Sequence, residues 1–319
     1  MSTLQTPLGS GFGPASTTAD VIKGVSLEGK IAVVTGGYAG LGLETARILA
    51  SAGARVIVPA RDLQKAAAAL NGLEGVELEP MDLIDPGSID TFARKFLDSG
   101  RPLHILVNNA GVMALPQLKR DARGVEHHFA INHLGHFQLA LRLLPALRRA
   151  KGARVVSLSS RGHQRSDVVF DDLNFERREY QPMLAYGQSK TANILFAVGL
   201  DARESARGVR AFSVHPGSIV ATDLGRYLST EQLRALGVID ENGRPILDPE
   251  RQLKTVEQGA ATQVWCATSP RLEGMGGVYC ENVEVARLVS TEGSSGVRPY
   301  AIDPRSADRL WELSEGLLG

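Results

Sequence analysis

Short apolar segments alternate with longer amphipathic segments along most of this chain. The apolar segments are typical of buried strands, and they cover residues 31–35, 55–60, 76–80, 103–108, 154–159, 209–215 and 276–281. The intervening segments predict helices over residues 41–53, 62–72, 86–100, 123–150, 183–206, 255–268 and 306–317. Buried strands separated by helices indicate a parallel sheet that is covered on both faces. The pattern therefore predicts an α/β fold: a single doubly wound domain with about seven parallel strands.

Two parts of the chain depart from this alternation. Residues 1–28 are rich in Gly, Ser, Thr and Pro, and they predict an extension on or beside the core with a short helix around residues 19–24. Residues 29–319 then form the domain, within which residues 223–253 predict a loop region beside the substrate. Residues 240–243 in that region predict a surface hairpin or loop.

Composition excludes several classes of protein. The 35 Lys and Arg residues balance 35 Asp and Glu residues, whereas a broad nucleic-acid surface needs a basic excess. Only two cysteines occur in 319 residues, which excludes a disulfide framework. No apolar run approaches the roughly 20 residues of a membrane span, and the N-terminus lacks the features of a secretory signal. We therefore expect a cytoplasmic protein with no nucleic-acid partner.

A glycine-rich turn follows the first predicted strand. Gly36, Gly40 and Gly42 lie between that strand and a helix. Glycines there let the backbone turn tightly and approach a pyrophosphate, while the helix N-terminus offers N–H groups and positive potential. The alternative is a plain structural turn, since 34 glycines give many chance matches. Its position favours a dinucleotide site.

Tyr186 and Lys190 are four residues apart in a predicted helix, so their side chains share one face. A lysine ammonium near a phenol can lower the pKa of the phenol, which would then exchange a proton near neutral pH. The pair alone is only suggestive, because about 0.15 such pairs are expected by chance from the composition.

Further polar residues fall at the carboxyl ends of predicted strands, where a doubly wound fold places its site. They are Asn108 to Gly111, Ser159 and Ser160, and His215 to Gly217, with Asn132 in the helix after the fourth strand. Taken in order, these motifs resemble the short-chain dehydrogenase/reductase family with its Rossmann fold. The stretches NNAGVM, NHLGHF, YGQSKTANILFA and GGVY resemble its retinol-dehydrogenase-like branch, and the resemblance extends from about residue 25 to the C-terminus.

The resemblance implies four catalytic roles. Tyr186 would be the general acid/base, and Lys190 would bind the nicotinamide ribose and lower the tyrosine pKa. Ser160 would hydrogen-bond the substrate oxygen, with Ser159 as the alternative. Asn132 would hold a water that connects Lys190 to solvent; alternatively it only hydrogen-bonds backbone.

The same resemblance implies the cofactor contacts. Asp82 would contact adenine, although it could instead be a turn residue. Thr222 would bind the nicotinamide carboxamide, although one extra residue precedes it and the loop could be re-registered. The full expected set is Gly36, Tyr38, Gly40, Leu41, Gly42, Arg61, Asp82, Leu83, Asn108, Ala110, Gly111, Tyr186, Lys190, Pro216, Gly217, Ile219 and Thr222.

The second predicted strand favours NADP(H) over NAD(H). An NAD-specific turn carries an acid at its tip to hold the ribose 2′-hydroxyl, and here the strand ends with Ala60 and Arg61. A guanidinium suits a 2′-phosphate. Asp62 could turn inward and favour NAD(H), but we expect it to cap the next helix.

The substrate is expected to be a small apolar alcohol or carbonyl compound. We expect its pocket to combine Met113, Leu115, the segment after Ser160, and apolar residues within 223–253: Leu224, Tyr227, Leu228, Leu233, Leu236, Val238, Ile239, Ile246 and Leu247. Four of the seven histidines cluster in residues 127–136, but without other ligands they predict packing residues and no metal site.

Together these features predict an NADP(H)-dependent oxidoreductase that interconverts an alcohol and its ketone or aldehyde. The alternatives are an NAD(H)-dependent alcohol dehydrogenase and a non-catalytic dinucleotide sensor, which would not need the Ser, Tyr, Lys and Asn together. The helices over residues 123–150 and 183–206 commonly pair between subunits in the family, so the resemblance implies a homodimer or homotetramer.

Overall fold

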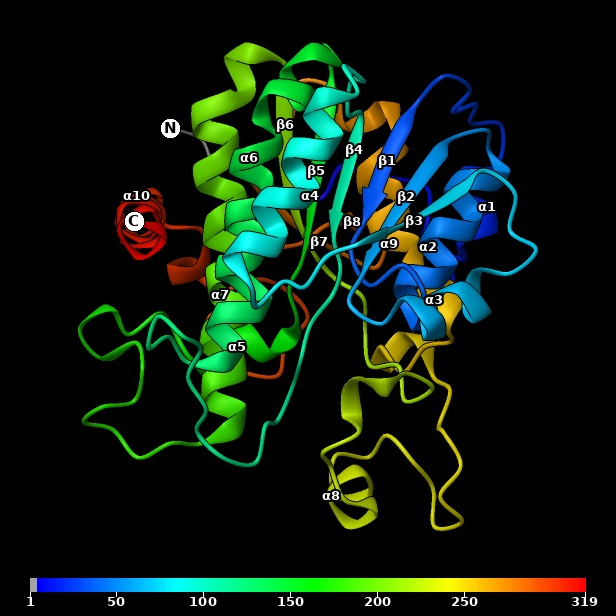
Figure 1. Cartoon of the computed structure of the whole chain (residues 1–319). Helices are drawn as coiled ribbons and strands as arrows, with labels where there is room; N and C mark the ends of the chain where they lie inside the picture. The colour runs from blue at the N-terminus through cyan, green and yellow to red at the C-terminus, as the bar shows by residue number, and fades with distance from the viewer. Residues whose placement is uncertain (1–4) are drawn as a thin grey trace.

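The computed structural model describes residues 5–319 and places one eight-stranded sheet at the centre of the molecule (Figure 1). The first seven strands run parallel, and the eighth pairs antiparallel with the seventh. Their spatial order is β3 (Val76–Pro80), β2 (Arg55–Ala60), β1 (Ile31–Val34), β4 (Ile105–Asn108), β5 (Ala153–Leu158), β6 (Val209–His215), β7 (Val278–Glu281) and β8 (Glu284–Val285). The predicted doubly wound fold is confirmed.

Helices cover both faces of this sheet. One face carries α4 (Pro86–Asp98), α5 (His127–Phe129), α6 (Gly135–Arg149), α7 (Pro182–Glu204) and, outermost, α10 (Pro304–Leu318). The other face carries α1 (Thr18–Ile22), α2 (Gly40–Ser51), α3 (Leu63–Leu70) and α9 (Val256–Thr268). Successive strand residues alternate between the two cores: Val33 belongs to the first, and Ala32 and Val34 belong to the second.

The structure corrects two expectations about secondary structure. The helix predicted over residues 123–150 begins only at His127, and a π-helix over Ala130–Leu134 separates α5 from α6. The expected count of about seven strands omitted β8, which follows a tight turn at Asn282 and Val283. The π-helix contains Asn132, a residue of the expected site, and β8 forms one edge of the sheet.

The described part of the N-terminal extension lies on the core, while residues 1–4 fall outside the described residues. The Gln5 side chain donates to the carbonyls of Tyr279 and Ala286 and accepts from the Tyr279 amide at 2.9 Å. Farther on, the Thr17 side chain caps α1, which packs against α9 and α2. The extension is therefore held to β7 and to the α9 face.

The carboxyl ends of the strands face the segment between β6 and α9. This segment contains α8 (Thr230–Ala235) and projects below the sheet in Figure 1, on the side toward which the strand arrows point. The turn at residues 240–243 is closed by Gly243 N–H donating to Asp240 O at 3.0 Å, as expected for a surface hairpin.

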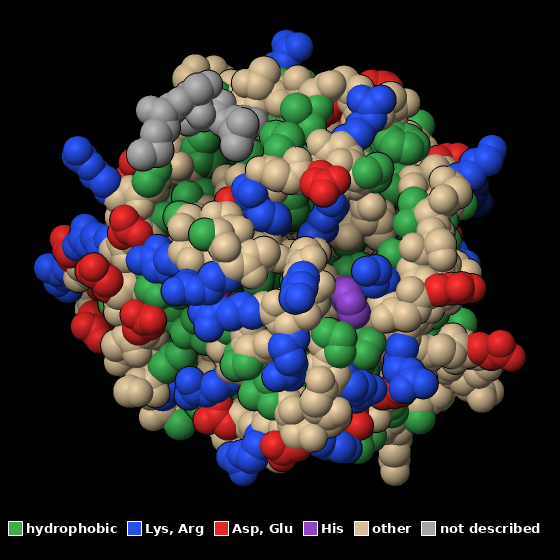
Figure 2. All heavy atoms as spheres, turned by 90° about the horizontal axis from the view of Figure 1, so that it is seen from above, with side chains coloured by type: hydrophobic (Ala, Val, Ile, Leu, Met, Phe, Trp, Pro, Cys, Tyr) green, Lys and Arg blue, Asp and Glu red, His purple; other side chains and the backbone are tan. Residues whose placement is uncertain are grey.

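The opposite edge of the sheet is rich in charge. Figure 2 shows Lys and Arg side chains over the middle of this face, with Asp and Glu mostly toward its edges. The chain forms many ion pairs, such as Arg148 with Glu204 at 2.7 Å and Arg210 with Asp201 at 2.8 Å. Among residues 5–319, no helix combines the length and apolar character needed to cross a bilayer.

Candidate active site

The glycine-rich turn joins β1 to α2 at the carboxyl edge of the sheet. Gly36 and Gly40 have φ values of 64° and 49°, a region that disfavours residues with a Cβ. A Cβ on Gly42 would lie 2.3 Å from the Gly36 carbonyl oxygen, so only glycine fits there. Among residues 5–319, no side chain caps the N-terminus of α2, which leaves its first N–H groups directed at this turn. The cradle fits the pyrophosphate of a dinucleotide.

Thr35 connects this turn to the segment after β4. Its Oγ1 accepts hydrogen bonds from the backbone N–H groups of Asn109 at 2.9 Å and Ala110 at 3.0 Å. The Asn109 side chain donates to the Thr35 carbonyl at 2.9 Å and would be hit by a Cβ on Gly42. These bonds hold the ends of β1 and β4 in one rigid unit.

His136 extends the same network to the π-helix. Its Nδ1 lies 3.0 Å from the Asn132 carbonyl oxygen, which can only accept, so Nδ1 carries the proton. Its Nε2 then accepts from the Thr35 hydroxyl at 2.8 Å. Burial lowers the pKa of His136 to about 4, so the ring is neutral at physiological pH.

The Asn132 side chain is fully engaged with its surroundings. Its Oδ1 accepts from Val112 N–H at 2.8 Å, and its Nδ2 donates to the Val112 carbonyl at 3.0 Å and to Ser189 Oγ at 2.9 Å. The amide thus bonds both the backbone of Val112 and the side chain of Ser189. They fix Asn132 beside Gly111, where a Cβ would lie 3.1 Å from Asn132 Oδ1 and 3.5 Å from Lys190 Nζ.

Tyr186 and Ser160 lie next to each other where β5 meets α7. The Ser160 hydroxyl accepts from Gly162 N–H at 3.0 Å, and a Cβ on Gly162 would lie 3.3 Å from Ser160 Oγ. A Cβ on Gly162 would lie 2.9 Å from the tyrosine ring, so glycine is needed for this approach. Ser159 instead donates to the Lys190 carbonyl at 2.8 Å, which ties it to the backbone of α7.

Lys190 lies one helical turn after Tyr186, as its spacing predicted. Its Nζ is 5.5 Å from the centroid of the Tyr186 ring and donates to the Leu158 carbonyl at 3.0 Å. Both side chains are almost completely buried. Four expected catalytic residues are thus brought together: Asn132, Ser160, Tyr186 and Lys190.

The pKa values in this arrangement differ from our expectation that Lys190 lowers the pKa of Tyr186. Burial raises the pKa of Tyr186 to about 12, and the hydrogen bond from Ser160 only partly opposes it. Burial also lowers the pKa of Lys190 to about 7. Removal from water disfavours the charged form of each group, and this effect outweighs the attraction between them.

The ends of β2 and β3 place Arg61 beside Asp82. The guanidinium is 4.0 Å from the Asp82 carboxylate and largely exposed, with 76% of its side chain accessible. Asp82 Oδ1 also accepts from Ile84 N–H at 3.2 Å, so it does form the turn considered as an alternative. Asp62 accepts from Lys65 N–H at 3.0 Å and caps α3, as expected.

The remaining expected cofactor residues surround the same edge. Leu83 is buried, and its carbonyl would lie 2.3 Å from a Cβ on Gly135. Asn108 is buried and lies 3.5 Å from Ser157 Oγ. Tyr38 is partly buried against the α2–α9 core.

The segment after β6 folds back onto the glycine-rich turn. Pro216 and Gly217 follow His215, and Gly217 has a φ of 97°. The Thr222 methyl group would lie 3.0 Å from a Cβ on Gly40, so Thr222 faces the turn. Its hydroxyl donates to the Ile219 carbonyl at 3.1 Å. Ile219 and Leu41 both pack against Gly259 of α9.

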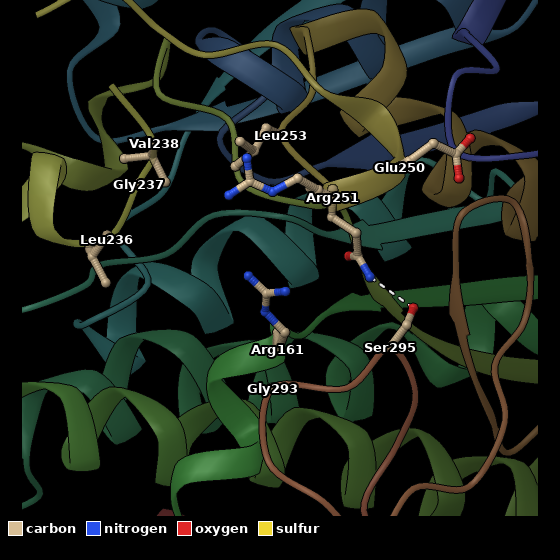
Figure 3. A pocket seen from close by; sticks show the side chains of 10 residues that line it. Arg161, Leu236, Gly237, Val238, Glu250, Arg251, Leu253, Gly293 and Ser295 are labelled. Carbon is tan, nitrogen blue, oxygen red and sulfur yellow. Dashed lines mark hydrogen bonds between the residues drawn. The ribbon is translucent and has the colours of Figure 1, made fainter. Parts of the chain in front are cut away.

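A cavity of about 330 Å³ is lined by Arg161, the residue after Ser160, and by residues of the segment between β6 and α9 (Figure 3). Its lining differs from the expected apolar pocket, because two arginines face each other across it. Of the expected residues, Leu236, Val238 and Arg161 of the segment after Ser160 line this cavity, whereas Met113 and Leu115 do not. Tyr227 and Leu247, which we expected in the pocket, instead lie exposed on the surface of the loop region.

Sequence reasoning missed three residues that position the site. Thr35, Asn109 and His136 were given no role, although each makes two or more of the hydrogen bonds described above. The sequence signal for Thr35 and Asn109 was their place at strand ends. No sequence signal marked His136, because a histidine that only packs in the core shows the same sequence pattern. No group of His, Cys, Asp and Glu within residues 5–319 is arranged to hold a metal ion.

Comparison with known proteins is consistent across sequence and structure. A family model described as short chain dehydrogenase matches residues 30–233. A Streptomyces antibioticus protein named as an oxidoreductase is 46% identical over 302 residues, which cover 92% of this chain and 99% of that protein. Human retinol dehydrogenase 12 is 39% identical over 301 residues, covering 92% and 88%.

Two solved structures are also similar. An uncharacterized protein from Mycobacterium paratuberculosis has a TM-score of 0.71 at 33% identity, over 95% of this chain and 97% of that chain. A Pseudomonas aeruginosa RhlG/NADP complex has a TM-score of 0.61 at 26% identity, over 80% and 95%. The shared fold, the match of the family model to residues 30–233 and these relatives show that the chain belongs to the short-chain dehydrogenase/reductase family and is an oxidoreductase.

Proposed function

We propose that this protein is an NADP(H)-dependent oxidoreductase that interconverts an alcohol and its ketone or aldehyde, with Tyr186 as the general acid/base. The observation that carries the proposal is the placement of three side chains together: the Tyr186 ring and Ser160 Oγ both lie against Gly162, and Lys190 Nζ is 5.5 Å from the centroid of the Tyr186 ring. A dinucleotide sensor would need only the glycine-rich cradle. The joint presence of these side chains supports a catalyst.

A bound nicotinamide dinucleotide would supply the hydride in reduction and accept it in oxidation. Gly36, Gly40 and Gly42 would hold its pyrophosphate, and Pro216, Ile219 and Thr222 would border the nicotinamide end. Asp82, Leu83, Asn108 and Ala110 would border the adenosine end, as the resemblance implies. The geometry of the glycine turn supports this assignment.

The side chains of the protein would supply the proton that the substrate oxygen takes up during reduction. During reduction, the substrate carbonyl carbon gains the hydride while its oxygen takes the phenolic proton of Tyr186, which gives the alcohol and a phenolate. Ser160 would donate a hydrogen bond to the same oxygen. The raised pKa of Tyr186 keeps the phenol protonated at neutral pH, which favours the reductive direction.

Replacing Tyr186 with Phe tests this mechanism. Only the hydroxyl is lost, so NADPH binding should persist while kcat falls roughly 10²–10⁴-fold, the usual contribution of a general acid/base. Tyr180→Phe is the matched control, since its hydroxyl contacts the Leu115 carbonyl outside this group, and it should stay within a few-fold of the parent. Stopped-flow or steady-state turnover of a ketone panel with NADPH gives the rates. A Tyr186→Phe rate near that of the parent would exclude the proposed role.

We further propose a homodimer or homotetramer, which rests on the family resemblance. The two long helices do lie on one face of the sheet, where α10 also packs against α7. Light scattering at micromolar concentration measures the mass directly, and a monomer would contradict this proposal.

A further inference from the structure

The cavity lined by Arg161 has an unusual lining for a pocket that receives an apolar substrate. We refer to it as the arginine cavity; it is lined by Arg161, Leu236, Gly237, Val238, Glu250, Arg251, Gln252, Leu253, Gly293 and Ser295. In Figure 3, Arg161 and Arg251 approach it from opposite walls, whereas the Glu250 carboxylate points away. Leu253 and Val238 supply apolar surface beside the two guanidiniums.

Neither guanidinium is neutralised by a direct partner. Among residues 5–319, the side chains of Arg161 and Arg251 form no ion pair and no hydrogen bond, although the chain forms many such pairs elsewhere, for example Arg148 with Glu204 and Arg178 with Asp172. Two unpaired guanidiniums on facing walls repel each other and favour a bound anion between them.

The surrounding charges leave the cavity positive. Buried Glu281 accepts a hydrogen bond from Ser295, and burial raises the pKa of its carboxyl although the charges of Lys254 and Arg161 oppose this. Lys254 donates to Asn282 at 2.8 Å. Burial, with Arg161 and Lys254 nearby, lowers the pKa of His215 well below its ordinary value, which fits a positive local field. A negatively charged ligand group would be stabilised there.

The walls of the cavity are built on the catalytic framework. Arg161 directly follows Ser160, and its backbone N–H donates to His215 Nδ1 at 3.2 Å. Opposite, the Gln252 carbonyl accepts from Ser218 N–H at 2.8 Å, next to the segment that follows β6. Gln252 is buried with a φ of 63°, a conformation that costs free energy for a residue other than glycine, and its side chain donates to Ser295 Oγ at 2.9 Å. The cavity therefore borders the site of hydride transfer, and the hydrogen bonds to His215 and from Ser218 hold its walls in place.

We propose that the arginine cavity binds the carboxylate of an amphipathic substrate, so that the enzyme acts on oxo acids or hydroxy acids whose carbonyl or alcohol lies at the Tyr186 end of an apolar chain. This inference rests on the proposed function and adds the substrate class to it. Arg161 and Arg251 would each donate to the carboxylate, and Leu253 and Val238 would contact the chain next to it.

The test compares each oxo acid with its methyl ester, which differs mainly in charge. A series from 4-oxopentanoate to 9-oxodecanoate is reduced with NADPH, and kcat/KM is measured for acid and ester. The acid should exceed the ester by at least 10-fold at one or more chain lengths. Arg161→Leu and Arg251→Leu should each reduce kcat/KM for that acid by 10- to 100-fold through KM, and should change the ester by less than about 3-fold.

Arg234→Leu is the matched control, because it removes the same charge from α8 while its guanidinium contacts the Glu241 carbonyl outside the cavity. It should leave the preference for the acid unchanged. Equal or better turnover of the esters by the parent enzyme would overturn the inference while leaving the oxidoreductase function intact. A rise in KM for NADPH in the two arginine variants would overturn it too, since the arginines would then serve the cofactor.

A binding measurement separates the inference from the proposed function. Calorimetric titration with octanoate and with methyl octanoate needs no turnover. Binding of octanoate that is lost in Arg161→Leu and Arg251→Leu supports the cavity even if no substrate is turned over. Absence of any charge-dependent binding, together with no preference in the kinetic series, excludes it.

Discussion

At the scale of single residues, the chemistry of this site depends on how deeply its side chains are buried. The four-residue spacing placed Tyr186 and Lys190 on one face of α7, as expected from sequence. Their pKa values could not be predicted that way, because burial of each group depends on Gly111, Gly162 and the packing of β5. Sequence therefore identified the pair, and the fold decides its protonation.

We propose that the cofactor preference also depends on a single residue, Arg61. Arg61 stands at the tip of β2 with an exposed guanidinium, while Asp62 is occupied as the cap of α3. Arg61→Ala should raise KM for NADPH about 10- to 100-fold, because a charge-assisted bond to the 2′-phosphate is lost, and should leave KM for NADH nearly unchanged. Steady-state kinetics with both cofactors measures this.

Asp62→Ala is the companion variant for that experiment. It should lower the free energy of unfolding by about 1 kcal/mol through loss of the helix cap and leave the cofactor ratio as it was. A parent enzyme that prefers NADH, or an Asp62→Ala variant that loses NADH binding, would show that Asp62 holds the ribose instead.

His136 gives a residue-scale prediction about stability. In His136→Phe, the Asn132 carbonyl and the Thr35 hydroxyl both lose their buried partner, at a cost of about 1–3 kcal/mol each. Urea unfolding should show a loss of about 2–5 kcal/mol. His127→Phe, at a half-buried histidine of the same segment, should change the stability by less than about 0.5 kcal/mol. Equal effects in both variants would contradict the role of the network.

At the scale of elements, sequence periodicity gave most helices and strands but not their irregularities. The π-helix over Ala130–Leu134 leaves the apolar pattern of residues 123–150 almost unchanged, so nothing in that pattern marks it. Strand β8 follows a turn in which Asn282 and Val283 both have positive φ, at 53° and 60°. Hairpin turns of this kind favour Asn-Gly, and a valine there gives no sequence signal.

The C-terminal helix provides a prediction at this scale. Trp311 of α10 is buried, with its ring 4.9 Å from that of Phe137 and against Gly199 of α7. Trp311→Ala should lower the free energy of unfolding by about 3–5 kcal/mol, because a large buried ring is lost and a cavity remains. Chemical denaturation measures the change. Exposed Glu315→Ala on the same helix is the control and should have an effect below about 0.5 kcal/mol.

At the scale of the whole molecule, buried histidines make stability depend on pH. Burial lowers the pKa of His133 to about 3, and it lowers the pKa values of His136 and His163 to about 4. The unfolded chain binds protons at these residues below about pH 6.5, whereas the folded chain does not until about pH 4. The free energy of unfolding should therefore fall as the pH drops from 6.5 to 4, by about 3 kcal/mol per histidine.

His133→Phe tests this dependence while keeping an aromatic ring between Phe129 and Phe137. The variant loses one titrating group, so its free energy of unfolding should fall less steeply between pH 6.5 and 4 than that of the parent. Urea titrations at several pH values give both slopes. Identical slopes would show that His133 does not titrate in this range.

Ser160 and Asn132 were expected only from the family resemblance, but the sequence by itself determined the doubly wound fold, the glycine-rich turn and the shared helix face of Tyr186 and Lys190. These features follow from local causes: hydrophobic period, helix spacing and the steric freedom of glycine. The tertiary structure alone decided the His136 network, the pKa values, the covering of α7 by α10 and the facing arginines of the cavity. Each of these joins residues far apart in the chain, so it depends on contacts, burial and charge that no local pattern records.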